Sequence, residues 1–225
     1  MQPHDFWQTT EPAGETGETF AGSYPAGLPG GRCLRLPIRA LADGVHGLAS
    51  LIINQASFAV QAELADALAE RLAPYRPEVV VGLPTLGLTL ASLVAQRLGH
   101  RRYVPLGTSK KFWYEEHLSV PLSSITTVVE KRLYVDPRLL PLLEGKRVAV
   151  VDDVISSGAS MVAGLDLMTR IGIEPVAIGA AMLQTQAWRE RLAALDPAWP
   201  GKVVGVFATP RLVRTEDGHW RAEVS

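Results

Sequence analysis

The chain has 225 residues, which is enough for one well-buried domain with appendages, and we expect one main domain. Its 22 Lys and Arg against 23 Asp and Glu leave no excess of positive charge to hold a polyanion, so nucleic acid is not expected as the main ligand. The single Cys33 excludes an internal disulfide framework and a cysteine-based zinc site, and it fits a reducing cytoplasm.

The first third of the chain contains three predicted elements. Residues 1–33 are rich in Gly, Pro, Thr and Glu, and we expect a mobile or loosely draped arm. Short alternating pieces around the turn sequence ADGVHG predict a small β-hairpin over 34–58. An amphipathic helix is expected over 56–72, where apolar residues recur at intervals of four: Val60, Leu64, Leu68 and Leu72.

The rest of the chain alternates predicted strands with helices. Strands are expected at 79–81, 103–106, 148–151, 176–182 and 203–207, and helices at 87–98, after 160 and at 187–195. This alternation indicates parallel βαβ units, with helices on both faces of one sheet. The uncharged run 79–96 is long enough for a membrane span, but its Pro and Gly residues favour strand, loop and helix. The N-terminus shows no signal peptide, and no membrane partner is expected.

The stretch VAVVDDVISSGAS, residues 148–160, places two acids and a run of small residues after an apolar strand. The small residues lie where a helix begins, so their backbone N–H groups can cradle a phosphate, with Gly158 free to take a positive φ. Carboxylates at Asp152 and Asp153 suit a ribose diol or a hydrated Mg²⁺. The alternatives are a serine that only caps the helix, and an aspartate that only forms a salt bridge.

The loop GLPTLG, residues 82–87, also precedes a predicted helix. Its two glycines suggest the phosphate loop of nucleotide triphosphatases. However, Leu88 stands where that motif needs its lysine, so this class is disfavoured. Because ligands of parallel sheets bind at the carboxyl ends of the strands, we expect both loops to lie at one site. A plain strand-to-helix turn remains the alternative for GLPTLG.

The stretch VAVVDDVISSGAS resembles the phosphoribosyl diphosphate (PRPP) binding motif of type I phosphoribosyltransferases, and the likeness extends over about 49–207, closest to the purine and orotate members. The resemblance implies a Rossmann-like α/β fold with a parallel five-stranded sheet and a small β-rich hood, within a domain of 34–225. It also implies Asp152 and Asp153 on the ribose hydroxyls, with Mg²⁺ bound through PRPP. Further implied site residues are a 5′-phosphate loop of Ile155, Ser156, Ser157, Gly158, Ala159 and Ser160, and a pyrophosphate loop of Leu83, Pro84, Thr85, Leu86 and Gly87.

The long connection 107–140 is expected to be a flexible lid. The resemblance places Lys110 and Lys111 against pyrophosphate, although two lysines on a solvated loop are the alternative. The aromatic run Phe112, Trp113 and Tyr114 departs from the family pattern, and it either stacks on a base, seals the closed site or anchors the loop on another subunit. We expect Glu115, Glu116 and His117 to be solvated.

The expected reaction transfers the phosphoribosyl group of PRPP to a nucleobase and releases pyrophosphate. A purine such as adenine is favoured because the predicted hairpin lacks an obvious Arg cluster for orotate, although Arg35 and Arg39 weaken that contrast. Phe207 is a candidate base contact. The alternatives are an orotate-type enzyme and a PRPP-sensing regulator without turnover. PRPP and a nucleobase are the expected partners of a cytoplasmic homodimer.

Overall fold

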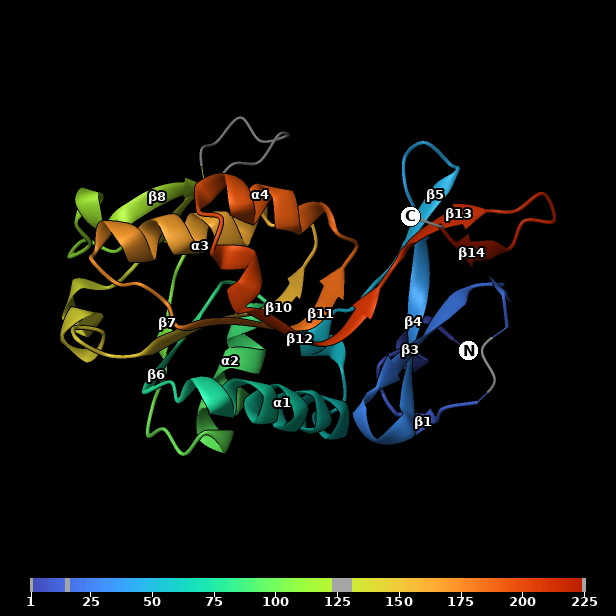
Figure 1. The fold of residues 1–225 in the computed structure, drawn as a ribbon, viewed down its shortest axis with the longest axis horizontal. Helices are drawn as coiled ribbons and strands as arrows, with labels where there is room; N and C mark the ends of the chain where they lie inside the picture. The colour runs from blue at the N-terminus through green and yellow to red at the C-terminus, as the bar shows by residue number, and fades with distance from the viewer. Residues whose placement is uncertain (1, 15–16, 123–130, 224–225) are drawn as a thin grey trace.

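The computed structural model describes residues 2–14, 17–122 and 131–223. Its centre is a five-stranded sheet in the order β12–β11–β10–β6–β7, and every neighbouring pair is parallel (Figure 1). The strands of this core sheet are β6 (Val79–Gly82), β7 (Val104–Pro105), β10 (Val148–Ile155), β11 (Ala177–Gln184) and β12 (Val203–Thr209). The predicted parallel α/β fold is confirmed.

Helices cover both faces of the core sheet. In β10, Ala149 and Val151 face the cluster packed by α1 and α2, while Val148 and Val150 face the cluster packed by α3. A strand buried on both faces reads as a continuous apolar run, which explains the stretch VAVV. The helices are α1 (Phe58–Leu72), α2 (Gly87–Arg97), α3 (Ala159–Arg170) and α4 (Ala187–Leu195).

The predicted hairpin is present as β4 (Arg32–Ala40) and β5 (His46–Ala49), and it belongs to a larger antiparallel sheet, called the hood here. The C-terminal strand β13 pairs with β5, so both ends of the chain build the hood (Figure 1). Its other strands are β1 (Glu11–Pro12), β2 (Thr19–Phe20), β3 (Ser23–Leu28), β13 (Arg211–Arg214) and β14 (Trp220–Ala222).

The N-terminal segment differs from the expected loose arm wherever it is described. Its strand β3 pairs with β4 along six residues, and β1 pairs with the other edge of β4. Trp7 is buried, and its indole Nε1 donates to the Ser50 carbonyl at 2.9 Å. The segment gave no clear periodicity because β1 and β2 have two residues each.

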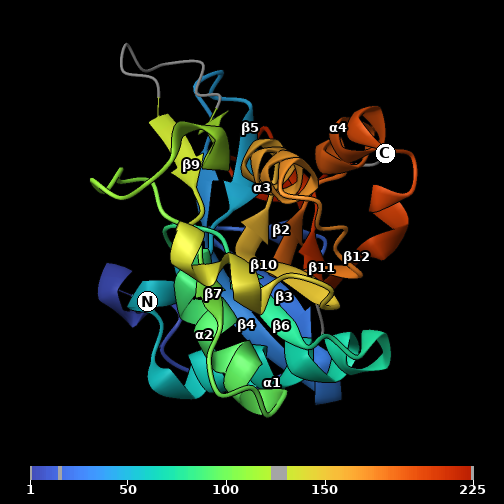
Figure 2. The ribbon, with the colours of Figure 1, turned by 90° about the vertical axis from the view of Figure 1, so that its left-hand side faces the viewer.

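The expected lid, 107–140, contains an antiparallel pair, β8 (Ser119–Leu122) and β9 (Lys131–Tyr134), which packs against α3 (Figure 2). Its residues 123–130 lie outside the described part of the chain. No helix in the described ranges is long and apolar enough to cross a membrane. Short 3₁₀ helices complete the fold: η1 (Pro3–Asp5), η2 (Pro29–Gly31), η3 (Ile53–Gln55), η4 (Ala73–Tyr75), η5 (Glu116–Leu118), η6 (Pro137–Leu142) and η7 (Trp199–Lys202).

Candidate functional site

The small-residue loop lies between the end of β10 and the start of α3, as predicted. Gly158 stands at the N-cap of α3 with φ of 80°, in the left-handed region, and no side chain caps this helix. The Ala159 N–H donates to Ser157 Oγ at a long 3.4 Å, and the next N–H groups of the helix start remain available to an anion, at the positive end of the helix dipole. The loop lines a small cavity of about 100 Å³ together with Asp152. We call this the loop cavity.

The two acids lie inside β10 instead of beyond its end. Asp152 and Asp153 are each only 7% exposed. Pairing with β11 continues through them, because Asp152 pairs with Ala180 and Val154 with Met182, so the backbone stays in the sheet. The backbone N–H of Asp153 donates to Asp152 Oδ1 at 2.9 Å.

Burial raises the pKa of both carboxyls, and the neighbouring charge of Asp153 raises the pKa of Asp152 further. The two side chains border different spaces: Asp152 lines the loop cavity, and Asp153 lines a larger cavity that faces the hood. Alternation along a strand gives neighbouring residues different surroundings. The two acids therefore have different surroundings.

The predicted pyrophosphate loop, 83–87, runs from the end of β6 into α2. Gly87 packs directly on Asp152, because an added Cβ would lie 2.8 Å from the Asp152 Cα and closer still to its carboxylate. Any larger residue would push the helix start away from the acid. The peptide bond between Pro84 and Thr85 is cis. Leu83 is buried, Thr85 is exposed, and Leu86 lines the hood-facing cavity.

The hood-facing cavity has a volume of about 490 Å³, within the range of ligand pockets. Its walls come from the hood hairpin, the segment after β5, the loop before α2, and the carboxyl ends of β10 and β11. The residues that line it are Arg39, Ala40, Leu41, Leu48, Ala49, Ser50, Leu51, Leu86, Asp153, Val154, Met182 and Gln184. It is therefore a mostly apolar space with a few polar groups beside one of the predicted acids.

Sequence reasoning missed Gln184, which ends β11 and is 7% exposed. A polar residue after the apolar run of a predicted parallel strand, at the same sheet edge as the acids, was the available signal. Phe207, predicted as a base contact, is buried in β12 and lines a separate cavity with Pro74 and Tyr75. The structure does not bring Phe207 to the hood-facing cavity.

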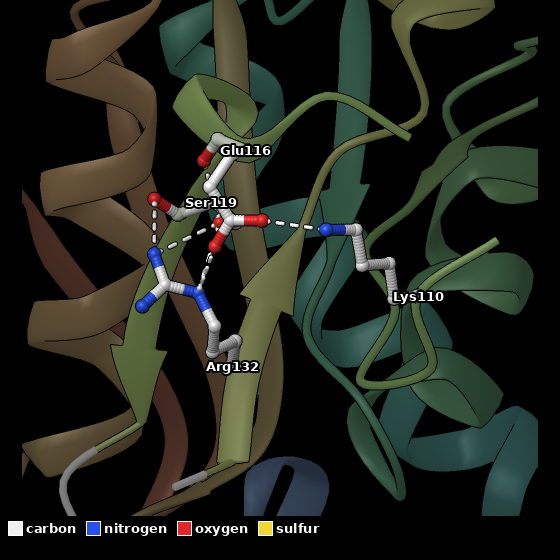
Figure 3. A network of polar contacts seen from close by, with 4 residues as sticks. All are labelled: Lys110, Glu116, Ser119 and Arg132. Atoms are coloured by element: carbon white, nitrogen blue, oxygen red, sulfur yellow. Dashed lines mark hydrogen bonds and ion pairs between the residues drawn. The ribbon is translucent and has the colours of Figure 1, made fainter. Parts of the chain in front are cut away.

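The predicted basic pair is exposed, and neither lysine lines the loop cavity or the hood-facing cavity. Lys110 Nζ lies 2.6 Å from Glu116 Oε2, and Arg132 Nε lies 3.3 Å from the other oxygen of this carboxylate (Figure 3). Ser119 accepts a hydrogen bond from Arg132 in the same network. The bond to Glu116 raises the pKa of Lys110, so the amine stays charged.

The aromatic run makes different contacts at each position. Trp113 donates to Asp136 Oδ2 at 3.2 Å and lies under the Arg138 guanidinium, while Phe112 is 96% exposed. The neighbouring pair Glu115 and His117 is exposed, with 3.5 Å between carboxylate and ring nitrogen. Trp113 is therefore anchored within its own chain.

The two arginines of β4 named above, Arg35 and Arg39, have different partners. Arg35 forms an ion pair with Glu11 at 2.6 Å, whereas Arg39 lines the hood-facing cavity and donates to Ser50 Oγ at 3.1 Å. Among the described residues, no cluster of three or more His, Cys, Asp or Glu side chains is placed to hold a metal by itself.

Known proteins with the same architecture are phosphoribosyltransferases. The model of the phosphoribosyl transferase domain family matches residues 48–205. The chain is 31% identical to the adenine phosphoribosyltransferase of Streptomyces coelicolor over 148 residues, 66% of this chain and 77% of that one. For the enzyme of Thermobifida fusca the identity is 35% over 133 residues, 58% and 72% of the two chains.

Among solved structures, the adenine phosphoribosyltransferase of Giardia lamblia with 9-deazaadenine superimposes with a TM-score of 0.56 at 18% identity. The match covers 67% of this chain and 80% of that one, and it shows a shared fold. The family model alone spans more than half of the chain, and it contains both predicted loops and both acids. The chain belongs to the type I phosphoribosyltransferase family.

Proposed function

We propose that this protein transfers the 5-phosphoribosyl group of PRPP to a purine base, with adenine as the first candidate, and releases pyrophosphate. One observation carries the proposal: the neighbouring acids Asp152 and Asp153 line the loop cavity and the hood-facing cavity respectively, and Val154 lines both. A ligand that spans both would place a phosphate on the amides of α3, its ribose hydroxyls on the acids, and a base beneath the hood. The names of the two bacterial relatives support adenine.

In this reaction the bond between C1 of the ribose and pyrophosphate breaks, and a bond from a ring nitrogen of the base to C1 forms. The ring nitrogen loses its proton to the departing pyrophosphate or to solvent. Positive charge develops on the ribose, and carboxylates at Asp152 and Asp153 hold its hydroxyls and stabilise that charge. The amides of residues 156–160 fix the 5′-phosphate, so the reacting atoms meet in a defined geometry.

Mg²⁺ is part of this proposal, and the residues present fit it. Asp152 and Asp153 supply only oxygen donors, which Mg²⁺ prefers, and one or two carboxylates together with substrate phosphates are its usual ligands. The ion would neutralise charge on the departing pyrophosphate. The acids would reach it through water while they hold the ribose.

One observation favours a second acceptor class. Arg39 lines the hood-facing cavity, and a guanidinium pairs well with a carboxylate such as that of orotate. The competing fact is that Arg39 already donates to Ser50 and that the other walls are mostly apolar. A planar, uncharged purine suits such walls better than an anion does.

The test is release of pyrophosphate from PRPP and Mg²⁺ with adenine, guanine, hypoxanthine, xanthine, uracil and orotate supplied in turn. We expect release with adenine. Release with orotate alone would favour the second class, and PRPP binding without release for any base would favour a regulator. Binding of PRPP should weaken at least ~10-fold in Asp153→Asn and in Ser157→Ala, because each removes a hydrogen-bonding partner of a charged or desolvated ligand group.

A matched control for these variants is Asp66→Asn. Asp66 lies on α1, where it forms a surface ion pair with Arg97, and the substitution makes the same change of charge. Its PRPP affinity should equal that of the unaltered protein. Unchanged PRPP affinity in both Asp153→Asn and Ser157→Ala would contradict the assignment of the site.

The proposal includes a homodimer in the cytoplasm. Phe58 at the start of α1 is 88% exposed and Phe112 is 96% exposed, and large apolar side chains at the surface are suited to contacts between subunits. Light scattering during gel filtration gives the mass directly. A mass near 24.3 kDa, that of one chain, would contradict the dimer.

A further inference from the structure

Gln184 is one of the polar side chains that line the hood-facing cavity. It ends β11, the strand next to β10, and lies two residues beyond Met182, which pairs with Val154. Asp153 is therefore set back along the sheet, roughly 10 Å from Gln184 at the rise of a strand. A ligand whose ribose lies on Asp153 would extend its base toward Gln184.

The orientation of the Gln184 amide is fixed by its hydrogen bond. Its Nε2 donates to the backbone carbonyl of Ala49 at 2.5 Å, so the bond joins the core sheet to the hood. A carbonyl can only accept, so the opposite assignment, with Oε1 facing Ala49, would place two acceptors together. Because the side chain is 7% exposed and held by this bond, its carbonyl oxygen has one preferred direction.

That carbonyl oxygen is free to accept. No residue in the described ranges donates to Gln184 Oε1, and the atom is not among the fully enclosed polar atoms that lack a partner. Gln184 lines the hood-facing cavity, so the available side of the amide is an acceptor presented to a ligand. An acceptor held in place selects a ligand that carries a donor.

We propose that Gln184 is a specificity-determining residue that accepts a hydrogen bond from the exocyclic amine of a 6-aminopurine. This inference rests on the proposed function. Adenine carries an N–H donor at position 6, whereas hypoxanthine carries an oxygen there. The 6-oxo group facing Oε1 would set acceptor against acceptor in a largely desolvated space.

Other polar groups of the cavity do not duplicate this role. Arg39 is a donor, and it lies on the hood wall with Ser50 as its partner. Asp153 lines the part of the cavity where the proposed function places the ribose. Among the side chains that line the cavity, Gln184 is therefore the acceptor that would select for an amine on the base.

The experiment compares kcat/KM for adenine, hypoxanthine and unsubstituted purine, which lacks the amine, in the unaltered protein, in Gln184→Met and in Thr209→Val. Methionine keeps the length of the side chain without its amide. Thr209 pairs with Gln184 in the sheet, and its hydroxyl has no hydrogen-bond partner. Thr209→Val is therefore a nearby polar-to-apolar control outside the lining of the hood-facing cavity.

We expect the unaltered protein to prefer adenine over both analogues by at least ~10-fold. Gln184→Met should lose at least ~10-fold with adenine and little with hypoxanthine, while PRPP affinity stays unchanged and reports an intact fold. Thr209→Val should keep the adenine preference. If Gln184→Met does not fold, the comparison of adenine with purine in the unaltered protein still tests the inference.

An adenine-to-hypoxanthine ratio in Gln184→Met equal to that of the unaltered protein would overturn the inference, as would equal use of adenine and purine. Use of hypoxanthine in preference to adenine would overturn it while leaving phosphoribosyl transfer in place. Absence of both PRPP binding and pyrophosphate release with every base would instead overturn the proposed function, and this inference with it.

Discussion

The buried carboxyl pair of β10 makes the stability of the free protein depend on pH. Burial, together with the neighbouring Asp153, raises the pKa of Asp152 well above its usual range. The folded state then keeps a proton that the unfolded chain releases above about pH 4. The free energy of unfolding therefore falls as the pH rises from about 4 toward the raised pKa, because the native state binds more protons.

Asp152→Asn should reduce this dependence, and the part that comes from the raised pKa of Asp153 should remain. The neutral amide keeps an oxygen that can accept from the Asp153 backbone, but it has no charge to desolvate. At pH 8 we expect the variant to have a higher free energy of unfolding than the unaltered protein, by about 1.4 kcal/mol for each pKa unit by which the native carboxyl is raised. Its melting temperature should be higher accordingly. The gap should close near pH 4. Melting temperatures measured from pH 4 to 8 provide the check.

A surface carboxylate is the control for that experiment. Asp166 pairs with Arg170 on α3, and Asp166→Asn should follow the pH profile of the unaltered protein. The same slope of melting temperature against pH in Asp152→Asn and in the unaltered protein would show that the buried acid does not hold the proton. Loss of PRPP binding in Asp152→Asn, alongside higher stability, would show that the acid serves the ligand at a cost to the fold.

At the scale of elements, the segment 107–118 holds Lys110 in an ion pair that competes with any bound pyrophosphate. The Lys110 and Glu116 side chains are 52% and 63% exposed, so water screens their pair and it contributes little to stability. A bond this weak can be exchanged for one to an anion. Lys110 thus remains a proposed pyrophosphate contact, held by Glu116 in the free protein (Figure 3).

Glu116→Gln should therefore raise the affinity for PRPP by up to ~5-fold, because Lys110 would no longer have to break an ion pair before it binds pyrophosphate. Calorimetry with PRPP and Mg²⁺ measures the change. Glu115→Gln makes the same change of charge one residue away, where the partner is His117, and should have a smaller effect. Equal gains in both variants would assign the effect to net charge, and no gain in Glu116→Gln would remove Lys110 from the site.

The elements that could be predicted from the sequence are those whose pattern is local. Helix α1 shows its four-residue spacing, and Ser57 caps it by accepting from the Val60 backbone at 3.2 Å. The strand at 148–151 was predicted from its apolar run, but β10 continues to Ile155 because pairing with β11 holds the backbone of the acids. The polar pair marks neither the end of the strand nor the end of burial, since Asp152 and Asp153 are both buried.

At the scale of the whole molecule, the hood could not be predicted in full. Strand β5 pairs with β13, more than 160 residues later in the chain, and no local pattern records such a pairing. The predicted phosphate loop and the acids lie within one contiguous stretch, so the sequence alone was enough to predict them as a site. The hood-facing cavity joins Ala49 to Gln184, and it becomes visible only when the sheet and the hood are assembled.

The N-terminal segment ties the hood side of the cavity to the core. Trp7 donates to the carbonyl of Ser50, a cavity residue, and its own carbonyl accepts from the Ser57 backbone at the start of α1. On the opposite face of the core sheet, Trp188 packs beneath Gly158 of the phosphate loop and donates to the Thr185 carbonyl. Two tryptophans therefore support the two halves of the proposed site.

Replacing each indole by phenylalanine keeps an aromatic ring and removes one N–H donor, so the two variants form a matched pair. Trp7→Phe should leave the Ser50 carbonyl without its partner, loosen the cavity wall and raise KM for the base several-fold, with PRPP affinity unchanged. Trp188→Phe should weaken the affinity for PRPP several-fold and leave KM for the base unchanged. Each should cost about 1–3 kcal/mol of stability, visible as a fall in melting temperature. If both variants changed KM for the base and PRPP affinity together, the hood and the phosphate loop would act as one unit, and the division of the site into two supported halves would be wrong.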